Sequence, residues 1–401
     1  MDRVIVVGGG LAGVRTVEAL RAKGHQGEVI LVSAERHRPY DRPPLSKAVL
    51  AGDADDTTVD VDWDELRCEM LLGERATALR PGDPSGGTVV TTAGELEFDG
   101  LVIATGARPI TLPGPGGRRV LRTVDDSRAL RARLAPGVRL VIVGAGWIGA
   151  EVATTAARKG CEVTVVEAAD APLSGALGPE VGALTARWYD EAGVRLRTGA
   201  KVAAVEPGAL LLADGERIAA DEILVGVGVR PELDWLAGSG VEIDGGVVTD
   251  AAFRVTVAGA LRSDIVAVGD CAAWWSKRYG RRLLVEHWDT ALNAPTVAAA
   301  ALLGEEGAEY DPVPYFWSEQ FGRMVQYAGY HPVAERVLHR GDPDGSTWAV
   351  CWLTGDRLDA VLTVDRPRDL VQARRVMSAG TPVDPDLLAD PERPVREATR
   401  R

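Results

Sequence analysis

Three glycines near the start of the chain have the spacing of a phosphate-binding turn. Gly8, Gly10 and Gly13 form a G-x-G-x-x-G motif directly after the apolar run VIVV at residues 4–7. In such a turn the first glycine permits a tight bend, the second lets the backbone approach a pyrophosphate, and the third lets a helix pack against the strand. The N–H groups at the start of that helix face the anion. The motif therefore predicts a site for the pyrophosphate of a dinucleotide.

An acidic residue follows at the spacing of a ribose ligand. Glu35 lies 22 residues after Gly13, beyond a second apolar strand predicted at residues 28–32. A carboxylate about 20 residues past the turn accepts hydrogen bonds from an adenosine ribose. A glycine turn alone can be an ordinary strand-to-helix connection. Strand, helix, second strand and acid occur together here, and this combination favours a dinucleotide site.

The same unit recurs in the middle of the chain. Residues 139–160, RLVIVGAGWIGAEVATTAARKG, repeat the pattern with which the chain begins, RVIVVGGGLAGVRTVEALRAKG. The glycines of the second copy are Gly144, Gly146 and Gly149, and its ribose acid is Glu167, 18 residues after the last of them. Two such units imply two dinucleotides. The economical pair is a tightly held flavin and a diffusible nicotinamide, because hydride transfer requires a donor and an acceptor in one site.

The composition fits an α/β protein of two or three domains, with 401 residues, 46% hydrophobic residues, 26% charged residues and 46 glycines. The net charge of −13 argues against nucleic acid or an anionic membrane as the main partner. No apolar stretch approaches the roughly 20 residues of a membrane span. The first residues also show no signal sequence, so we expect a cytoplasmic protein. The cysteines, Cys68, Cys161, Cys271 and Cys351, lie far apart, and no redox pair, metal site or disulfide is predicted.

Several other apolar strands end in residues that can contact a ligand. LVIATGARP (101–109) is typical of a strand that crosses between domains, and EILVGVGVR (222–230) repeats it. DIVAVGD (264–270) ends in Gly-Asp, where an open α/β sheet places its ligand groups. EHW (286–288) opens an alanine-rich helix, whose N-terminus can stabilise negative charge.

Two further segments complete the chain. PYDRPPLSK (39–47) contains adjacent prolines, which fix the backbone and could hold Lys47 at a defined place, the alternative being a rigid loop with a solvated lysine. Residues 315–401 predict a small α+β domain. We expect its last dozen residues, with Pro391 and Pro394 among charges, to form a loose tail.

Together these motifs resemble the NADH-dependent ferredoxin reductases that contain FAD, the group of putidaredoxin reductase and of the reductases of aromatic-ring dioxygenase systems. The likeness spans the whole chain through GGGLAG, RPYDRPPLSK, ATGARP, VGAGWIGAEVA, GVGVRP, AVGDCA, EHW, PYFWSEQ and DRLDAVLTVDRP. It implies an α/β fold with two Rossmann-like dinucleotide-binding domains, the FAD domain being interrupted by the NAD domain, and a small α+β C-terminal domain. The implied boundaries are 1–107 and 246–312 for the FAD domain, 108–245 for the NAD domain and 313–401 for the C-terminal domain.

The resemblance also implies the residues of the site. Besides the glycines of the first turn, the residues against FAD would be Ala12, Glu35, Lys47, Ala76, Arg122, Asp270 and Trp288. Asp270 would hold the ribityl hydroxyls. Further cofactor-binding residues from the shared motifs would be Arg42, Thr105, Ile148 and Gly228, beside Gly144, Gly146, Gly149 and Glu167 of the second turn.

Three residues would be catalytic. Lys47 would lie near flavin N5, paired with Glu151, and Trp317 would lie beside the isoalloxazine. Taken singly, they would be an exposed lysine, a glutamate placed for the helix dipole and a core tryptophan. Their joint occurrence in matching motifs favours the functional interpretation.

Three positions depart from the family's pattern. Ala34 stands where many members have an acid, Leu284 where they have an arginine, and Asn293 where they have a glutamine. These departures concern contacts to the ribose and the flavin ring and not the class of cofactor.

The resemblance implies an NADH:ferredoxin oxidoreductase, in which a hydride passes to the flavin and single electrons pass to a ferredoxin-type iron–sulfur protein that feeds an oxygenase. Glu167 favours NADH over NADPH, because a carboxylate repels a 2′-phosphate and the neighbours Ala168 and Ala169 offer no cation. A cationic run in this acidic chain is a candidate docking patch for the ferredoxin, or otherwise a solvated turn. Its members are Lys277, Arg278, Arg281 and Arg282.

Three alternatives share the fold. A pyridine nucleotide–disulfide reductase needs a redox dithiol beside the flavin, and a related NADH oxidase or peroxidase usually needs one reactive cysteine early in the FAD domain. The PPLSK region contains no cysteine. The third alternative is a flavin-bearing signalling or scaffold protein resembling apoptosis-inducing factor. Such a protein would form a long-lived complex of reduced flavin with NAD and pass electrons to no carrier.

Overall fold

The protein is described by a computed structural model over residues 1–400. Its contacts divide the chain into two compact units. Unit 1 contains Met1–Asp41, Thr57–Arg108 and Arg230–Pro314. Unit 2 contains Arg42–Asp56, Pro109–Val229 and the chain from Tyr315 onward. Two short strands, β8 (Ala107–Pro109) and β16 (Val229–Pro231), lie where the chain passes from one unit to the other.

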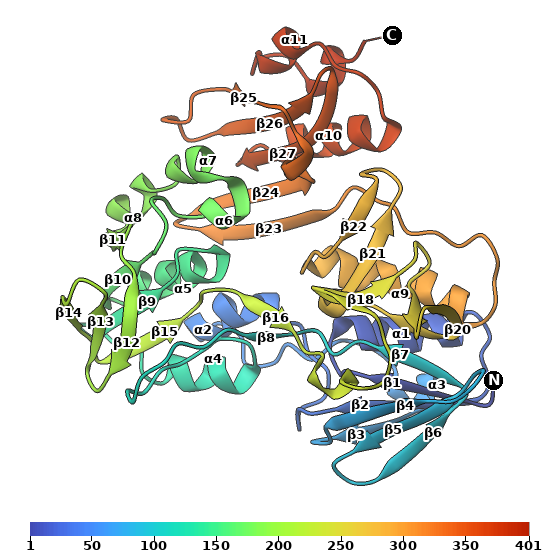
Figure 1. Cartoon of the computed structure of the whole chain (residues 1–401). Helices are drawn as coiled ribbons and strands as arrows, with labels where there is room; N and C mark the ends of the chain where they lie inside the picture. Colours follow the sequence, from blue (N-terminus) through green and yellow to red (C-terminus); the bar gives the residue numbers. More distant parts are fainter. Residues whose placement is uncertain (401) are drawn as a thin grey trace. The chain divides into compact units, whose positions relative to one another are not determined.

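Unit 1 is built around strand β1 (Arg3–Val7). This strand pairs in parallel with β2 (Glu28–Ser33) on one side and with β7 (Gly100–Ile103) on the other. A strand with parallel neighbours on both sides is buried on both faces, which explains its continuous apolar run. Helix α1 (Leu11–Ala22) follows β1 and lies beside α9 (Trp288–Leu302) over the sheet (Figure 1).

The sheet of unit 1 continues beyond these strands on both sides. Its order is β22 (Arg281–Leu283), β21 (Ala272–Ser276), β18 (Gly246–Thr249), β19 (Arg254–Val257), β20 (Ala260–Ala267), β7, β1, β2 and β3 (Cys68–Leu72), with β17 (Ile243–Asp244) paired to β18. A second, antiparallel sheet contains β4 (Ala76–Pro81), β5 (Gly87–Thr91) and β6 (Glu95–Phe98). Because β1, β7 and β20 run parallel, the residues that follow them meet at one edge of the sheet, where open α/β sheets bind ligands.

Unit 2 repeats the plan in its first part. Strand β9 (Arg139–Val143) pairs in parallel with β10 (Glu162–Val166) and β15 (Glu222–Val225), and β11 (Arg195–Arg197) extends the sheet. Helix α5 (Trp147–Arg158) follows β9 as α1 follows β1. The predicted α/β fold with two Rossmann-like units is confirmed. A three-stranded sheet lies beside this part, formed by β12 (Val202–Glu206), β13 (Ala209–Leu212) and β14 (Arg217–Ala219).

The last part of unit 2 is an antiparallel sheet covered by a helix. Its strand order is β23 (Tyr315–Gln320), β24 (Arg323–Gly329), β27 (Arg357–Val364), β26 (Trp348–Thr354) and β25 (Arg336–Arg340). Helix α10 (Pro367–Ala379) packs on β27 and β24. The remaining helices of both units are η1 (Pro43–Ser46), α2 (Ala48–Ala51), α3 (Trp63–Leu66), α4 (Val124–Arg131), α6 (Ser174–Leu177), α7 (Pro179–Ala183), α8 (Arg187–Glu191), η2 (Asp234–Leu236), η3 (Gly269–Cys271), η4 (His331–Val333), α11 (Pro385–Ala389) and η5 (Val395–Ala398).

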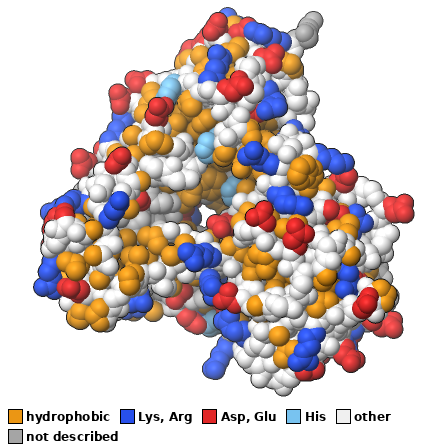
Figure 2. Space-filling view, viewed as in Figure 1, with side chains coloured by type: hydrophobic (Ala, Val, Ile, Leu, Met, Phe, Trp, Pro, Cys, Tyr) orange, Lys and Arg blue, Asp and Glu red, His pale blue; other side chains and the backbone are white. Residues whose placement is uncertain are grey.

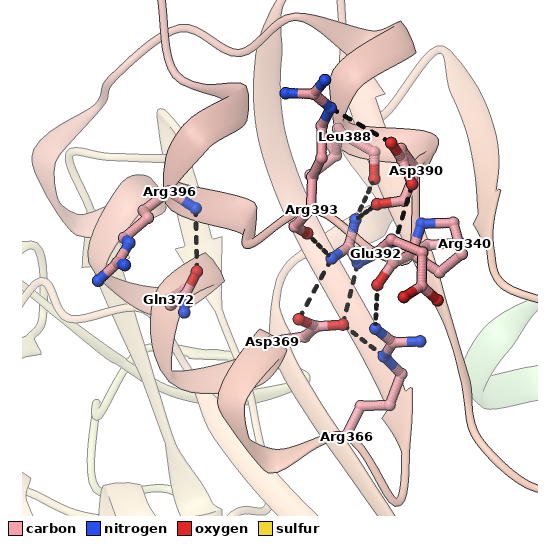
Figure 3. Close-up of polar contacts among 10 residues, drawn as sticks. Arg340, Arg366, Asp369, Gln372, Leu388, Asp390, Glu392, Arg393 and Arg396 are labelled. Carbon is pink, nitrogen blue, oxygen red and sulfur yellow. Dashed lines mark hydrogen bonds and ion pairs between the residues drawn. The ribbon is translucent and has the colours of Figure 1, made fainter.

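The prediction of a loose C-terminal tail was wrong. Arg340 at the end of β25 is only 1% exposed, and its guanidinium donates to the Asp369 carboxylate and to the main-chain carbonyls of Leu388, Asp390 and Arg393 (Figure 3). Arg366 donates to the same carboxylate. A buried guanidinium must have its donors paired, and here the tail supplies the acceptors. We call these contacts the Arg340 clamp.

The predicted boundaries include the segment 42–56 in the first part of the FAD domain. Its contacts place it in unit 2. Ser127 of α4 donates to the Leu45 carbonyl at 2.6 Å, and Thr155 of α5 donates to the Ser46 carbonyl at 3.0 Å. Both hydroxyls are buried and satisfy carbonyls that a short helix leaves unpaired.

Across residues 1–400, none of the helices has the length and apolar character needed to cross a membrane.

Candidate functional site

The first glycine turn leaves room for an anion at the start of α1. A Cβ on Gly8 would lie 2.0 Å from the carbonyl oxygen of Ala104, and a Cβ on Gly13 would lie 2.0 Å from that of Gly8, so both positions require glycine. A Cβ on Gly10 would meet no described atom within 4 Å. The first turn of α1 carries no acidic residue, and no side chain caps it. A pyrophosphate therefore fits here, because the space beside Gly10 at the N-terminus of the helix is open and no side chain caps it.

Other predicted residues of unit 1 lie at the same edge of the sheet. Ala12 of α1 packs against the turn after β20, since a Cβ on Gly269 would lie 2.9 Å from the Ala12 Cβ. Asp270, the next residue, is half-buried. Thr105 follows β7, and its hydroxyl donates to the Glu232 carbonyl at 2.7 Å. The structure thus brings the first turn, Thr105 and Asp270 to neighbouring strand ends, whereas Ala76 begins β4 in the second sheet of unit 1.

The predicted ribose acid of unit 1 is held by a side chain. The Tyr40 hydroxyl donates to the Glu35 carboxylate, and Glu35 is half-buried. Next to Tyr40, Asp41 accepts from the indole Nε1 of Trp288 at 2.7 Å. Two consecutive residues of the loop after β2 therefore hold the acid and the first residue of α9, Tyr40 binding Glu35 and Asp41 binding Trp288. The sequence analysis missed the contact of Tyr40.

His287 precedes α9 and is also set by its surroundings. Burial lowers the pKa of His287 to about 4, against the opposing attraction of Asp270. The imidazole is therefore neutral at pH 7. His287 is the N-cap residue of α9 and makes no side-chain hydrogen bond to the first turn of the helix. The neutral ring therefore adds no positive charge at this N-terminus.

The second glycine turn, in unit 2, has the same geometry. A Cβ on Gly144 would lie 2.3 Å from the Gly226 carbonyl oxygen, and one on Gly149 would lie 2.1 Å from that of Gly144. The space beside Gly146 is open within 4 Å among the described atoms, and no side chain caps α5. Ile148 is exposed on the first turn of α5, and Gly228 follows β15 with a φ of +109°. This turn also fits a pyrophosphate.

The acid of this second unit is held by the backbone. One carboxylate oxygen of Glu167 accepts from the Ala145 N–H at 2.8 Å and the other accepts from the Ala169 N–H at 2.9 Å. The first of these donors lies inside the glycine turn itself. Nearby Arg197 is engaged with Glu216 at 2.7 Å, so its charge is compensated.

Lys47 and Glu151 form an ion pair within unit 2. Lys47 Nζ lies 2.7 Å from Glu151 Oε2, and the Glu151 side chain is 3% exposed. Two hydroxyls that sequence reasoning missed also donate to this carboxylate, Ser46 at 2.5 Å and Ser318 at 2.6 Å. Ser46 lies in the shared motif RPYDRPPLSK beside Lys47, and Ser318 lies in PYFWSEQ beside Trp317, so the motifs themselves held the signal that could have found them.

Trp317 lies on β23 beside further aromatic and cationic groups. Its ring stacks on Tyr315 with centroids 6.0 Å apart, and the Arg374 guanidinium lies over Tyr315 at 4.7 Å. Elsewhere in unit 2, Arg42 donates to the main-chain carbonyl of Arg122 at 2.5 Å. These two arginines, predicted beside FAD, thus contact one another within unit 2.

Unit 2 also contains a cavity of 390 Å³ at the far end of α5. It is lined by Thr154, Ala157, Arg158, Trp188, Glu191, Ala192, Phe321, Gly322 and Arg323. The predicted site residues do not line it. The cavity is therefore no part of the predicted site.

The cationic run at residues 277–282 is partly neutralised. Lys277 forms an ion pair with Glu309 at 2.6 Å, and Arg282 donates to the main-chain carbonyl of Thr249. On the face drawn in Figure 2, acidic and basic side chains are intermixed. The charge of Lys277 is therefore compensated within the chain, whereas Arg282 keeps its charge.

Comparison with known proteins gives full-length relatives. Residues 2–294 match the family described as pyridine nucleotide-disulphide oxidoreductase, and residues 315–399 match the reductase C-terminal family. The ferredoxin–NAD(+) reductase component of the anthranilate 1,2-dioxygenase system of Burkholderia cepacia is 37% identical, over 97% of each chain. Putidaredoxin reductase of Pseudomonas putida is 34% identical, over 99% of this chain and 96% of that protein.

Solved structures agree with these matches. The crystal structure of Fdr9 has 47% identity and a TM-score of 0.92, covering 98% of this chain and 99% of that one. The crystal structure of the covalent putidaredoxin reductase–putidaredoxin complex has 34% identity and a TM-score of 0.92, covering 99% and 98%.

Proposed function

The chain belongs to the pyridine nucleotide-disulphide oxidoreductase family, and on that premise we propose that it is an FAD-dependent NADH:ferredoxin oxidoreductase. It oxidises NADH and delivers electrons one at a time to a ferredoxin-type iron–sulfur protein that serves an oxygenase. The relatives named as ferredoxin–NAD(+) reductase components, and the solved complex of putidaredoxin reductase with putidaredoxin, support this function. The predicted family and enzyme class are confirmed.

The residues of unit 1 would hold FAD. Gly8, Gly10 and Gly13 leave the space for its pyrophosphate, Glu35 would accept from its adenosine ribose, and Asp270 would accept from its ribityl hydroxyls. When bound, FAD accepts a hydride from NADH and gives up electrons singly. We place the FAD domain at 1–107 and 246–312, the NAD domain at 108–245 and the C-terminal domain at 313–401.

The residues of the second turn would hold NADH. The open space at Gly146 would admit the pyrophosphate, and Glu167 would accept from the adenosine ribose. Because the backbone N–H groups of Ala145 and Ala169 already fix the carboxylate, a 2′-phosphate would meet a negative charge that cannot turn away. NADH is therefore the preferred donor.

Lys47 would supply a positive charge beside the flavin N5. Its ammonium has three N–H donors, of which one is engaged by Glu151 at 2.7 Å and one by the Pro43 carbonyl at 3.2 Å. One donor remains for a cofactor atom. Glu151 orients the ammonium, and Trp317 would cover the ring face.

The cysteines argue against the thiol-dependent alternatives. All four are free, and two of them are buried. Burial raises the pKa of Cys271 to about 11 and that of Cys351 to about 12, so neither is a thiolate at pH 7. A disulfide reductase or a cysteine-dependent peroxidase needs a thiolate.

We also propose that the enzyme is cytoplasmic.

The observation that carries the proposal is the full-length match to ferredoxin–NAD(+) reductase components. The two glycine turns, both open to a phosphate, agree with it. The test is stopped-flow reduction of the purified yellow protein by NADH, followed by mixing with candidate ferredoxins. We expect rapid bleaching of the flavin and then rapid reduction of a ferredoxin. A reduced flavin that persists with NAD and reduces no ferredoxin would instead indicate a scaffold protein resembling apoptosis-inducing factor.

A further inference from the structure

Glu151 is a buried carboxylate that receives hydrogen bonds from three directions. Lys47 and Ser46 donate to Oε2 at 2.7 and 2.5 Å, and Ser318 donates to Oε1 at 2.6 Å. With the side chain 3% exposed, water cannot replace a missing donor. Each oxygen of the carboxylate therefore depends on a protein hydroxyl.

The proton of the Ser318 hydroxyl has one available direction. Gln320 donates its amide N–H to Ser318 Oγ at 3.1 Å, so that this oxygen acts as the acceptor on that side. The hydroxyl has a single proton, which then points to Glu151 Oε1 at 2.6 Å. Gln320 and Ser318 form a relay in which each group donates to the next. We call Gln320, Ser318 and Glu151 the β23 relay.

The relay follows from the strand that carries it. Along β23, Ser318 and Gln320 are both 0% exposed, while Glu319 between them points to solvent. This alternation is the period of a β-strand, and it aims two polar side chains at α5. Phe321 N–H at the end of β23 donates to the Thr154 hydroxyl of α5 at 2.9 Å, which fixes the strand at the helix.

We propose that Ser318, with its hydroxyl oriented by Gln320, is a positioning residue for Lys47, acting through Glu151. This inference rests on the proposed role of Lys47 beside the flavin. Without the Ser318 hydroxyl, Glu151 Oε1 is left buried and unpaired, and the carboxylate turns to recover a donor. The turn moves Oε2 away from Lys47 Nζ, and the ammonium loses the partner that aims it. The C-terminal sheet thereby sets the position of a charge on a segment more than 260 residues earlier in the chain.

The main test compares Ser318→Ala with wild type by single-turnover reduction of the flavin. We expect the limiting rate at saturating NADH to fall about tenfold, since one hydrogen bond to a charged group is lost. The NADH concentration at half-saturation and the FAD content should stay unchanged, because Ser318 contacts neither glycine turn. Ser318→Thr keeps a hydroxyl and should restore most of the rate.

The relay predicts two further results. Gln320→Leu should slow the reduction in the same direction and by a smaller factor, because the Ser318 proton is then free to rotate. A crystal structure of Ser318→Ala should show Lys47 Nζ more than 4 Å from Glu151. This second readout does not depend on turnover.

Thr363→Val is the matched control. Thr363 lies on β27 of the same sheet, is 0% exposed, and its hydroxyl has no hydrogen-bond partner among residues 1–400. Its loss tests the removal of a buried hydroxyl without the relay, and the rate should equal that of wild type. A slow Thr363→Val variant would overturn the inference, because any defect in the sheet would then suffice.

The outcomes separate this inference from the function on which it rests. If Lys47→Ala slows reduction and Ser318→Ala does not, the relay is wrong and the role of Lys47 stands. If Lys47→Ala leaves reduction unchanged, that role is wrong and the inference fails with it. If wild type reduces no ferredoxin, the proposed function fails while the crystallographic displacement of Lys47 can still be measured.

Discussion

The two glycine turns have the same backbone and hold their acids differently. In unit 1, Glu35 is fixed by the hydroxyl of Tyr40, whose neighbour Asp41 binds Trp288 at 2.7 Å. In unit 2, Glu167 is fixed by the N–H groups of Ala145 and Ala169. The first acid lies in a site built from segments far apart in the sequence, and the second is held by backbone N–H groups close to it. A site built from several segments suits a tightly bound cofactor, and a local turn suits a ligand that exchanges in each catalytic cycle.

The largest expected effect comes from filling the open space of one turn. Gly10→Ala adds a Cβ that meets no described atom within 4 Å, at an extended φ of −85°, so the fold should keep its stability. The same Cβ occupies the place of the pyrophosphate and should weaken FAD binding by about 1,000-fold. Fluorescence titration of the apoprotein with FAD measures this.

Gly146→Ala is the counterpart in unit 2, with the same open space at a φ of −78°. It should leave FAD bound and raise the KM for NADH by a comparable factor. If both variants lose FAD, the assignment of one ligand to each turn is wrong.

A smaller loss is expected from the ion pair of unit 2. Lys47→Ala and Glu151→Ala should each slow flavin reduction about 100-fold, while FAD binding changes by less than about threefold. Their proposed roles concern the reacting atoms, not the affinity of unit 1 for its cofactor. Stopped-flow mixing with NADH gives the rate, and an unchanged rate for both would make the pair purely structural.

The backbone-held acid should decide the nucleotide preference. Wild type is expected to prefer NADH in kcat/KM, and Glu167→Ala should narrow the gap to NADPH about tenfold by removing the repulsion. Glu35→Gln should not change that preference, because its unit is assigned the other dinucleotide. Equal kcat/KM values for NADH and NADPH in wild type would refute the assignment of Glu167.

Low pH should reduce the folding stability of unit 1 through the protonation of His287. The folded state holds the pKa of His287 at about 4, below the ordinary value of 6.5, because burial disfavours the charged ring. Its contribution to stability is therefore complete above pH 6.5 and is lost as the pH falls toward 4, by about 1 kcal/mol per pH unit. Between pH 7 and pH 5 the melting temperature of His287→Gln should fall less than that of wild type. Exposed His339→Gln should behave as wild type.

The smallest effect is expected from the cationic run at residues 277–282. Arg281→Glu with Arg282→Glu should lower kcat/KM for ferredoxin about threefold at low salt, lose most of that effect at high salt, and spare the reduction of flavin by NADH. Lys277→Glu should do less, because Glu309 already neutralises Lys277. Ferredoxin turnover that is unaffected at low salt would place docking elsewhere.

The sequence could predict the parts of the site that depend on short spacing. The glycines, Glu35 and Glu167 follow from local strand–turn–helix geometry, and the shared motifs led to Lys47 and Glu151. The partners Ser46 and Ser318 lie 105 and 167 residues from Glu151, and no local pattern records such contacts. The same limit explains the error at the C-terminus, where prolines and charges looked like a tail because their buried partner, Arg340, lies on another strand.

The Arg340 clamp has a consequence for synthesis. Arg340 leaves the ribosome before its main-chain acceptors, the carbonyls that lie 48 to 53 residues further along the chain. Until these carbonyls have been synthesised, folding of the sheet would bury the Arg340 guanidinium with Asp369 as its acceptor and the remaining donors unpaired. An incompletely paired buried charge costs several kcal/mol. The C-terminal domain therefore reaches its final packing only after nearly all of it has been made. A premature stop codon in the last few dozen codons removes little of the sheet and still leaves a protein with an unpaired arginine at its core, a target for proteolytic quality control.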